Sequence, residues 1–171
     1  TIFHFFFDLQ NFHWIQADFY HDPFWTWQRS AIVSLFVFCA GWGQAVAWEQ
    51  GQRWSRFFKR WGQVVVCALL VSAGSYWMFP NSFIYFGILH GLAVMLLITR
   101  LLAPWMTRAP ALTLFAGAIA LAAPWWAEAL HQLANGQLEV LNGSAWNWLG
   151  LIGRKPVTED YAPVLPWLGM M

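Results

Sequence analysis

Apolar residues dominate this chain in long runs, and most of these runs have the length of a membrane-crossing helix. The longest runs cover 23–48, 64–79, 83–103 and 110–133. About 20 apolar residues, each rising 1.5 Å, cross the roughly 30 Å hydrocarbon core of a bilayer. Shorter apolar runs occupy 1–12 and 163–171. The pattern therefore predicts an all-α, polytopic transmembrane bundle of about five to six helices.

Polar residues and prolines predict where the middle helices begin and end. Asp22 can cap the helix 23–48, and Pro23 fits its first position, where no backbone N–H is needed. Pro80 closes the third helix, and Pro104 predicts the end of the fourth. The turn 80–82 between them is very short, so we expect the third and fourth helices to pack antiparallel.

The remaining segments complete the predicted organisation. Pro124 predicts a kink within the run 110–133, because neighbouring groups can satisfy the carbonyl that a proline frees. Ser72 and Ser75 are available for hydrogen bonds between helices. A long polar stretch covers 134–162. Both ends of the sequence fall inside apolar runs, so we interpret 1–171 as one partial transmembrane domain that is cut within a helix at each end.

The composition agrees with a membrane location. Hydrophobic residues make up 59% of the chain and charged residues only 10%, whereas a soluble domain has about 25% charged residues. The 14 Trp and 15 Phe suit lipid contact and the bilayer interface. A net charge of +1 gives no indication of a nucleic-acid partner. The partner that the composition predicts is the lipid bilayer.

Basic residues predict the orientation of the bundle. The segment 49–63, interpreted as a linker, carries Arg53, Arg56, Lys59 and Arg60. The linker after the fourth helix carries Arg100 and Arg108. Short loops rich in Lys and Arg stay in the cytoplasm. Both linkers are therefore expected on the cytoplasmic side, two crossings apart, with 134–162 on the opposite side.

Ionisable groups at membrane depth are the candidates for a site, because they are costly unless they face a cavity or a partner. His4 and Asp8 lie four residues apart, so they share a helix face. His90 on the fourth helix and His21 before the second helix are expected at a similar depth. Histidine is the commonest general base. Arg29, inside the second helix, needs an anion, for which Asp8 is a plausible partner.

Three function classes fit this pattern. The chain has no phosphate-binding glycine loop, no nucleophile elbow and no zinc-protease motif, and no metal site is predicted. A transporter or channel subunit would also place His and Asp within a helix bundle. A membrane cytochrome would use His4 and His90 as axial haem ligands. An enzyme with an intramembrane histidine is the third class.

Four phrases resemble one family in the same order along nearly the whole chain. They are FHFFFDLQNF, YHDPFWTWQRSAIVSLFVFCAG, SYWMFPNSFIYFGILHGLAV and DYAPVLPWLG. They are similar to a bacterial membrane family related to the catalytic domain of heparan-α-glucosaminide N-acetyltransferase. FGILH and YxPxLPWxG are the more specific parts. The resemblance implies a polytopic enzyme that moves an acetyl group from cytoplasmic acetyl-CoA to a sugar amine or hydroxyl across the membrane.

The resemblance also implies roles for particular residues. His21 best matches the catalytic histidine of the lysosomal relatives, as base or acetyl carrier. His4 belongs to the HFxFDL phrase of the bacterial branch, and His90 to FGILH, where the lysosomal enzyme has a different polar residue. The candidate catalytic set is therefore His21, His4, Asp8 and His90.

Binding residues follow from the same chemistry. Arg29, Asn81 and Tyr85 are candidates to bind substrate or the oxyanion of the acetyl-transfer intermediate. Arg53, Arg56, Lys59 and Arg60 are candidates to bind the phosphates of acetyl-CoA, although they also serve as a topology signal. The acceptor is expected to be a small molecule or a glycan. The expected location is a bacterial inner membrane, and the sequence does not indicate the oligomeric state.

Overall fold

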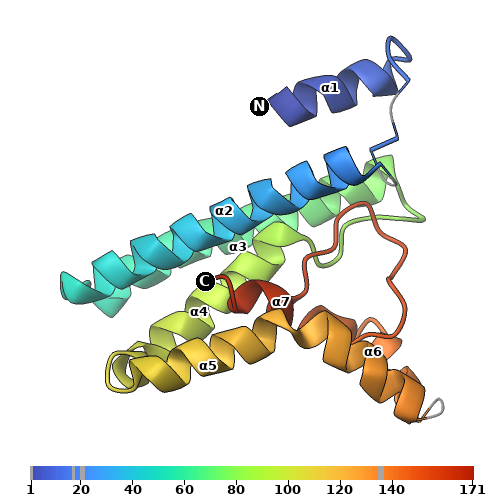
Figure 1. Ribbon diagram of the computed structural model, residues 1–171. Coiled ribbons are helices and arrows are strands. Elements are labelled where there is room, and N and C mark those ends of the chain that lie inside the picture. Colours follow the sequence, from blue (N-terminus) through green and yellow to red (C-terminus); the bar gives the residue numbers. More distant parts are fainter. Residues whose placement is uncertain (1, 17, 20–21, 135–136) are drawn as a thin grey trace. The chain divides into compact units, whose positions relative to one another are not determined.

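A computed structural model describes residues 2–16, 18–19, 22–134 and 137–171, with the backbone alone at positions 2, 4, 8 and 11. Every regular element in this part of the chain is helical, which confirms the all-α class. The elements are α1 (Ile2–Asn11), α2 (Pro23–Glu49), α3 (Trp54–Met78), α4 (Ile88–Met106), α5 (Pro110–Leu121), α6 (Ala123–Leu133), the 3-10 turns η1 (Glu139–Asn142) and η2 (Asn147–Leu149), and α7 (Val164–Leu168) (Figure 1).

Three of these helices, α2, α3 and α4, are long and apolar enough to cross a membrane. The pair α5 and α6 makes a fourth candidate, bent by 58° at the break between its helices. Large apolar side chains such as Leu69, Leu70 and Trp77 are 60%, 66% and 89% exposed on α3. Exposed apolar surface of this extent on a helix of spanning length indicates lipid contact. The chain is therefore an integral membrane protein.

The chain divides into two compact units, residues 1–36 and 37–171. The first unit contains an aromatic cluster around Phe19, which is buried and contacts the rings of Phe3, Phe7 and Trp25. In this unit, the backbone N–H of Phe24 donates to Asp22 Oδ1 at 2.8 Å. This bond confirms the predicted cap at the start of α2.

The second unit is built around α4. Its buried side chains include Leu92, Ala93 and Met95, and both α3 and α7 pack against it. A Cβ atom at Gly91 would lie 2.6 Å from the carbonyl oxygen of Ala162. Only glycine allows the segment before α7 to approach the helix backbone this closely.

The predicted linker 49–63 is wrong over most of its length. Helix α3 begins at Trp54, directly after Arg53 in extended conformation. The side chains of Arg56, Lys59 and Arg60 are exposed on its first turns, whereas Phe57 is buried. A buried Phe57 beside exposed charges makes this segment an amphipathic helix start. The basic residues of this segment suggested a linker, but they alternate with aromatic residues at a helical period.

The predicted bounds of the fourth helix are also wrong. Helix α4 starts at Ile88 and continues through Pro104 to Met106. Residues 79–87 form a non-helical connection instead of a three-residue turn. Two serines of α3 hold this connection, because Ser75 Oγ accepts from the Ile84 N–H and Ser72 Oγ donates to the Ile84 carbonyl. The backbone polar groups of Ile84 are thus satisfied without a helix.

The kink predicted at Pro124 is confirmed. Helix α5 ends at Leu121, and α6 begins at Ala123 with Pro124 in its first turn. The indole N–H of Trp126 donates to the Ile119 carbonyl at 2.9 Å. A side chain therefore satisfies a carbonyl close to the break, as membrane helices with a proline require.

Arg100 does not lie in a linker, as the sequence had suggested, but is buried within α4 and only 3% exposed. Its guanidinium carbon lies 4.9 Å from the ring centroid of Trp48, 5.0 Å from that of Trp54 and 5.7 Å from that of Phe57. It also donates to the carbonyl of Gln52. Arg100 therefore packs between the α2–α3 turn and α4, with its guanidinium near three aromatic rings and bonded to the turn.

Candidate functional site

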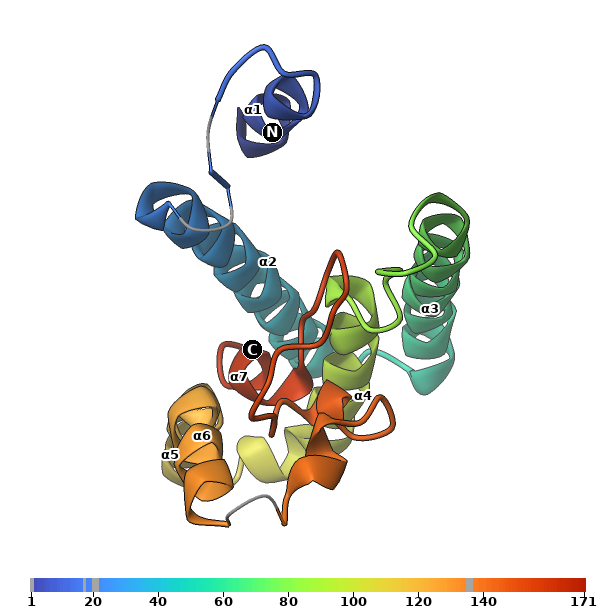
Figure 2. The same ribbon diagram turned by 90° about the vertical axis from the view of Figure 1, so that its right-hand side faces the viewer.

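A polar cluster forms where the connection 79–87 meets the segment 137–163, which we call the loop cap. The backbone N–H of Glu159 donates to the Ser82 carbonyl at 2.9 Å, and the Ser82 hydroxyl donates to Glu159 Oε1 at 2.6 Å. The Thr158 hydroxyl donates to the Phe83 carbonyl at 2.9 Å. The loop cap thus returns from α6 to the starting end of α4 (Figure 2).

Two side chains cap the N-terminus of α4 from different parts of the sequence. The N–H of Ile88 donates to Asp160 Oδ2 at 2.8 Å. The N–H of Gly87 donates to His90 Nδ1 at 3.3 Å. Both bonds satisfy backbone donors that a helix start leaves open, and the carboxylate also suits the positive end of the helix dipole. The FGILH phrase is therefore, in structural terms, a helix start with a capping histidine.

His90 is bonded through both ring nitrogens. Its Nε2 lies 3.1 Å from Ser72 Oγ, which in turn donates to the Ile84 carbonyl at 2.6 Å. Because Nδ1 accepts from a backbone N–H, this network assigns a neutral ring with its proton on Nε2, donated to Ser72. This arrangement leaves no free lone pair for a base or an iron ligand. The bond also confirms Ser72 as a residue that joins two helices.

Asn147 is the polar residue at the centre of the loop cap. It is 2% exposed; its Nδ2 donates to Tyr85 Oη at 2.6 Å, and its carbonyl accepts from Tyr161 Oη at 2.6 Å. Its Oδ1 is buried and has no hydrogen-bond partner within the described part of the chain. A buried, unpaired amide oxygen costs free energy and therefore needs a reason.

Burial keeps both tyrosines of this cluster protonated. It raises the pKa of Tyr85 above its ordinary value, while the bond from Asn147 acts in the opposite direction. Burial raises the pKa of Tyr161 further, and the neighbouring Tyr85 adds to this effect. Tyr85 accepts from Asn147 and so retains its own O–H proton as a donor.

The structure places some of the predicted site residues and not others. His21 lies outside the described residues, as do the side chains of His4 and Asp8. Arg29 is half-buried on α2 in the first unit. The pairing of Asp8 with His4 or Arg29 therefore stays a prediction.

Two predicted substrate-binding residues lie in the connection 79–87. Tyr85 joins the buried cluster, whereas Asn81 is exposed in the turn. Asn147 was missed in the sequence because its partner Tyr85 lies 62 positions away. The sequence indicated Asn147 only by its position between Trp146 and Trp148 within a polar stretch.

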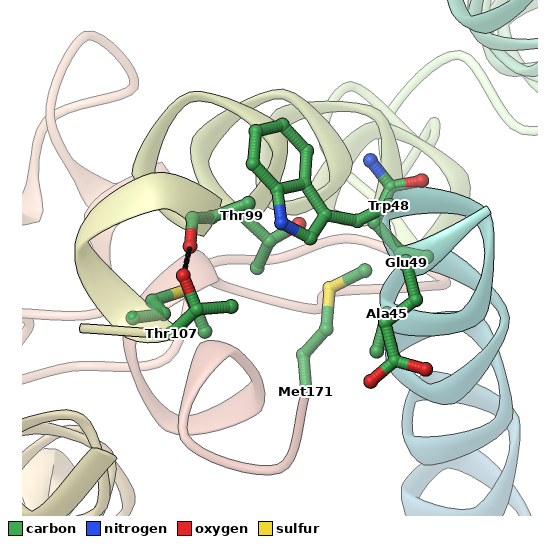
Figure 3. Close-up of a pocket in the computed structure, with 10 residues that line it drawn as sticks. Ala45, Trp48, Glu49, Thr99, Thr107 and Met171 are labelled. Carbon is green, nitrogen blue, oxygen red and sulfur yellow. Dashed lines mark hydrogen bonds between the residues drawn. The ribbon is translucent and has the colours of Figure 1, made fainter. Parts of the chain in front are cut away.

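A cavity of about 120 Å³ lies at the opposite end of α4, between α4 and the end of α2 (Figure 3). Trp48 and Glu49 line it from α2, Thr99 lines it from α4, and Thr107 lines it from the position directly after α4. Gln44 also lines it, and its Nε2 is buried without a partner among the described residues. The residues that follow α2 make this end of the second unit basic. They are Arg53, which directly precedes α3, and Arg56, Lys59 and Arg60 in the first turns of α3.

Within the described ranges, no group of three or more His, Cys, Asp or Glu side chains is placed to hold a metal ion.

The fold and these clusters define a polytopic, all-helical membrane protein with different polar chemistry at the two ends of α4. The family model for the heparan-alpha-glucosaminide N-acetyltransferase catalytic domain matches residues 1–171. The chain therefore belongs to this family, which supports a membrane acetyltransferase in general terms. No curated protein and no solved structure matches it.

Proposed function

We propose that this chain is the membrane core of an enzyme that takes an acetyl group from acetyl-CoA on the cytoplasmic side. The acceptor is a sugar amine or hydroxyl on the far side of a bacterial inner membrane. The family match over residues 1–171 carries this proposal. The two polar ends of the second unit support it, because a reaction across a membrane needs a donor site and an acceptor site on opposite faces.

The transfer needs one base and several hydrogen-bond donors. The acceptor nitrogen or oxygen attacks the thioester carbonyl, the base removes its proton, and coenzyme A leaves as a thiolate that takes up a proton. We assign His21 as the base. Arg29, Asn81 and Tyr85 are the donors that would hold the tetrahedral oxyanion, and Tyr85 has an available O–H proton (Tyr85 Oη accepts from Asn147).

His4 and Asp8 remain alternative catalytic groups under this proposal, with Asp8 charging or orienting the imidazole. His90 was a further candidate, but its nitrogens already bond Gly87 and Ser72. We therefore assign His90 as a positioning residue that holds the start of α4, where Tyr85 and the loop cap meet.

The donor is proposed to enter at the basic end. Arg53, Arg56, Lys59 and Arg60 would bind the phosphates of coenzyme A, because Arg and Lys suit phosphate oxygens. The cavity beside Trp48 is lined by the last turns of α2, which directly precede these basic residues in the sequence. It offers the unpaired amide N–H of Gln44. An unpaired N–H donor in a mostly apolar cavity is suited to an amide carbonyl of the acyl donor.

Substituting His21 in the full-length protein tests this proposal. General-base catalysis contributes about 10²–10⁴-fold, so His21→Ala should reduce acetyl transfer by that range while acetyl-CoA binding and purified yield stay near normal. His13→Asn is the matched control from the same loop, because His13 has a positive φ of 60° and Asn tolerates this conformation.

Other outcomes redirect the assignment. Normal turnover in His21→Ala together with its loss in His4→Ala would move the base to α1. A wild-type protein that neither binds acetyl-CoA nor transfers an acetyl group would favour a transporter. A Soret band in the purified protein would favour a cytochrome.

The proposed sidedness has its own test. Single cysteines at Ser55, in the first turn of α3, and at Ser144, in the loop cap, are both exposed. A membrane-impermeant thiol reagent should label Ser144→Cys from outside intact cells and Ser55→Cys only after lysis. A cysteine-free background is needed because Cys39 and Cys67 are exposed free thiols. Labelling of both positions from one side would overturn the orientation.

A further inference from the structure

A second cavity, separate from the one in Figure 3, has an almost wholly apolar wall. It has a volume of about 320 Å³ and lies between α4, α5 and the end of the chain. Short side chains leave it open along α5, and longer apolar ones close its other sides. The α5 residues on its wall include Leu112, Thr113, Ala116, Gly117 and Ala120. We call this cavity the α4–α5 slot.

The slot has one polar end. Arg108 lies on its wall in the turn between α4 and α5, and Trp105 lies beside it at the end of α4. Arg108 and Trp105 are both exposed. Tryptophan and arginine at the end of a spanning helix are typical of the membrane–water interface. The slot therefore starts at an interface, beside a cation, and continues into the membrane.

The length of the slot matches one leaflet. Its lining residues run from Ala109, directly before α5, to Ala120 on that helix, which corresponds to about 16 Å at 1.5 Å per residue. Half of the roughly 30 Å hydrocarbon core is about 15 Å. A ligand that fills the slot is therefore apolar along a full leaflet and anionic or polar at the interface.

We propose that the α4–α5 slot binds one acyl chain of an anionic phospholipid, with its phosphate on Arg108. Arg108 is the charged residue on a largely apolar wall, and Arg suits phosphate oxygens, so the slot fits an acyl chain that is joined to a phosphate. Anionic lipids are enriched in the cytoplasmic leaflet, where they attract Arg and Lys. The slot shares Thr99, Met106 and Met171 with the cavity beside Trp48, so the bound lipid would form part of the wall of the proposed donor cavity.

Lipid retention by the full-length protein tests this site independently of acetyl transfer. The protein is purified from nanodiscs that contain equal amounts of phosphatidylglycerol and phosphatidylcholine, and its bound lipid is counted by native mass spectrometry. We expect one retained phosphatidylglycerol per chain. Ala116→Trp should remove it by filling the slot, and Arg108→Gln should lower the preference for phosphatidylglycerol about fivefold.

Two matched variants separate the slot from general effects. Gly43→Trp adds the same ring at a position where a Cβ meets nothing within 4 Å, and Arg56→Gln removes an exposed cation outside the slot. Both should retain the lipid. A wild type with no retained lipid, or equal loss in Arg108→Gln and Arg56→Gln, would overturn the proposal. A photo-crosslinking test gives a further check, with benzoylphenylalanine placed at Leu112 on the wall of the slot. Cross-linking to protein instead of lipid would also overturn the proposal.

Discussion

Asp160 Oδ2 accepts a hydrogen bond from the backbone N–H of Ile88 at 2.8 Å, across 72 positions of the chain. The loop cap therefore supplies the acceptor for the Ile88 N–H, whereas His90 caps the N–H of Gly87. Asp160→Ala should cost about 0.5–2 kcal/mol of stability, the range for loss of a helix cap. Thermal unfolding of the detergent-solubilised protein measures it.

Asp160→Asn is the matched variant, because it keeps an acceptor oxygen and removes only the charge. The stability of Asp160→Asn should lie between that of the wild type and that of Asp160→Ala. Equal stability of all three proteins would show that water caps α4 as well as the carboxylate does.

His90 and Ser72 form one hydrogen-bonded unit, so their effects on stability should not be additive. His90→Ala removes the partner of the Gly87 N–H and of Ser72 Oγ, and should cost about 1–3 kcal/mol. Ser72→Ala should cost less. The double variant should fall short of the sum of the two by about 0.5 kcal/mol or more.

Ser144→Ala is the control partner for this cycle, because Ser144 is exposed in the loop cap. Its effect should add to that of His90→Ala within about 0.5 kcal/mol. Additivity in the His90 and Ser72 pair as well would mean that the two side chains do not interact in solution.

The stability of the loop cap should decrease at alkaline pH. Because the folded protein raises the pKa of Tyr161, the folded state keeps a proton that the unfolded chain loses near pH 10. This contribution is complete below about pH 10 and falls as the pH rises from there towards the folded-state pKa. Measuring the unfolding midpoint at several pH values between 8 and 11 tests this expected loss of stability.

Tyr161→Phe removes the titrating group and serves as the comparison. It should be less stable than the wild type at pH 8, because it loses the bond to the Asn147 carbonyl. The difference in stability between Tyr161→Phe and the wild type should decrease as the pH rises above 10. A constant difference across the range would rule out Tyr161 as a source of the alkaline loss.

Arg100 offers a test of shape against charge. Its Nε and Nη1 atoms are buried without hydrogen-bond partners among the described residues, so its charge is incompletely compensated. Arg100→Met keeps an extended side chain between the three rings and removes that charge. It should fold with nearly the wild-type midpoint, whereas Arg100→Ala leaves a cavity and should cost about 2–5 kcal/mol. A Met variant as unstable as the Ala variant would show that the guanidinium itself holds the α2–α3 turn, through its cation–π contacts and its bond to Gln52.

Local signals in the sequence predicted the helices well. The Asp22 cap depends on a residue two positions from its partner, and the bend at Pro124 depends on the chemistry of proline itself. The start of α3 was missed because four basic residues suggested a linker, although Phe57 and the charges between the aromatic residues follow a helical period. The same reliance on one residue type placed the end of α4 at Pro104.

The polar cluster was only partly predictable, because its bonds join distant parts of the sequence. The sequence predicted His90 as a catalytic candidate on the fourth helix and Tyr85 as a substrate-binding candidate. Their partners Ser72 and Asn147 come from α3 and from the loop cap. Residue type indicates that a buried polar group needs a partner, but the choice of partner depends on how the helices pack.

The return of the loop cap to α3 and α4 sets an order of events during synthesis. The hydroxyl of Ser82 cannot bond to Glu159 until that residue is synthesised, 77 residues later. At about 5–20 residues per second, this wait lasts roughly 4–15 seconds. During that interval α3 and α4 are inserted while the start of α4 lacks the Asp160 carboxylate. Chains that stop before residue 160 should therefore be the ones that membrane proteases remove.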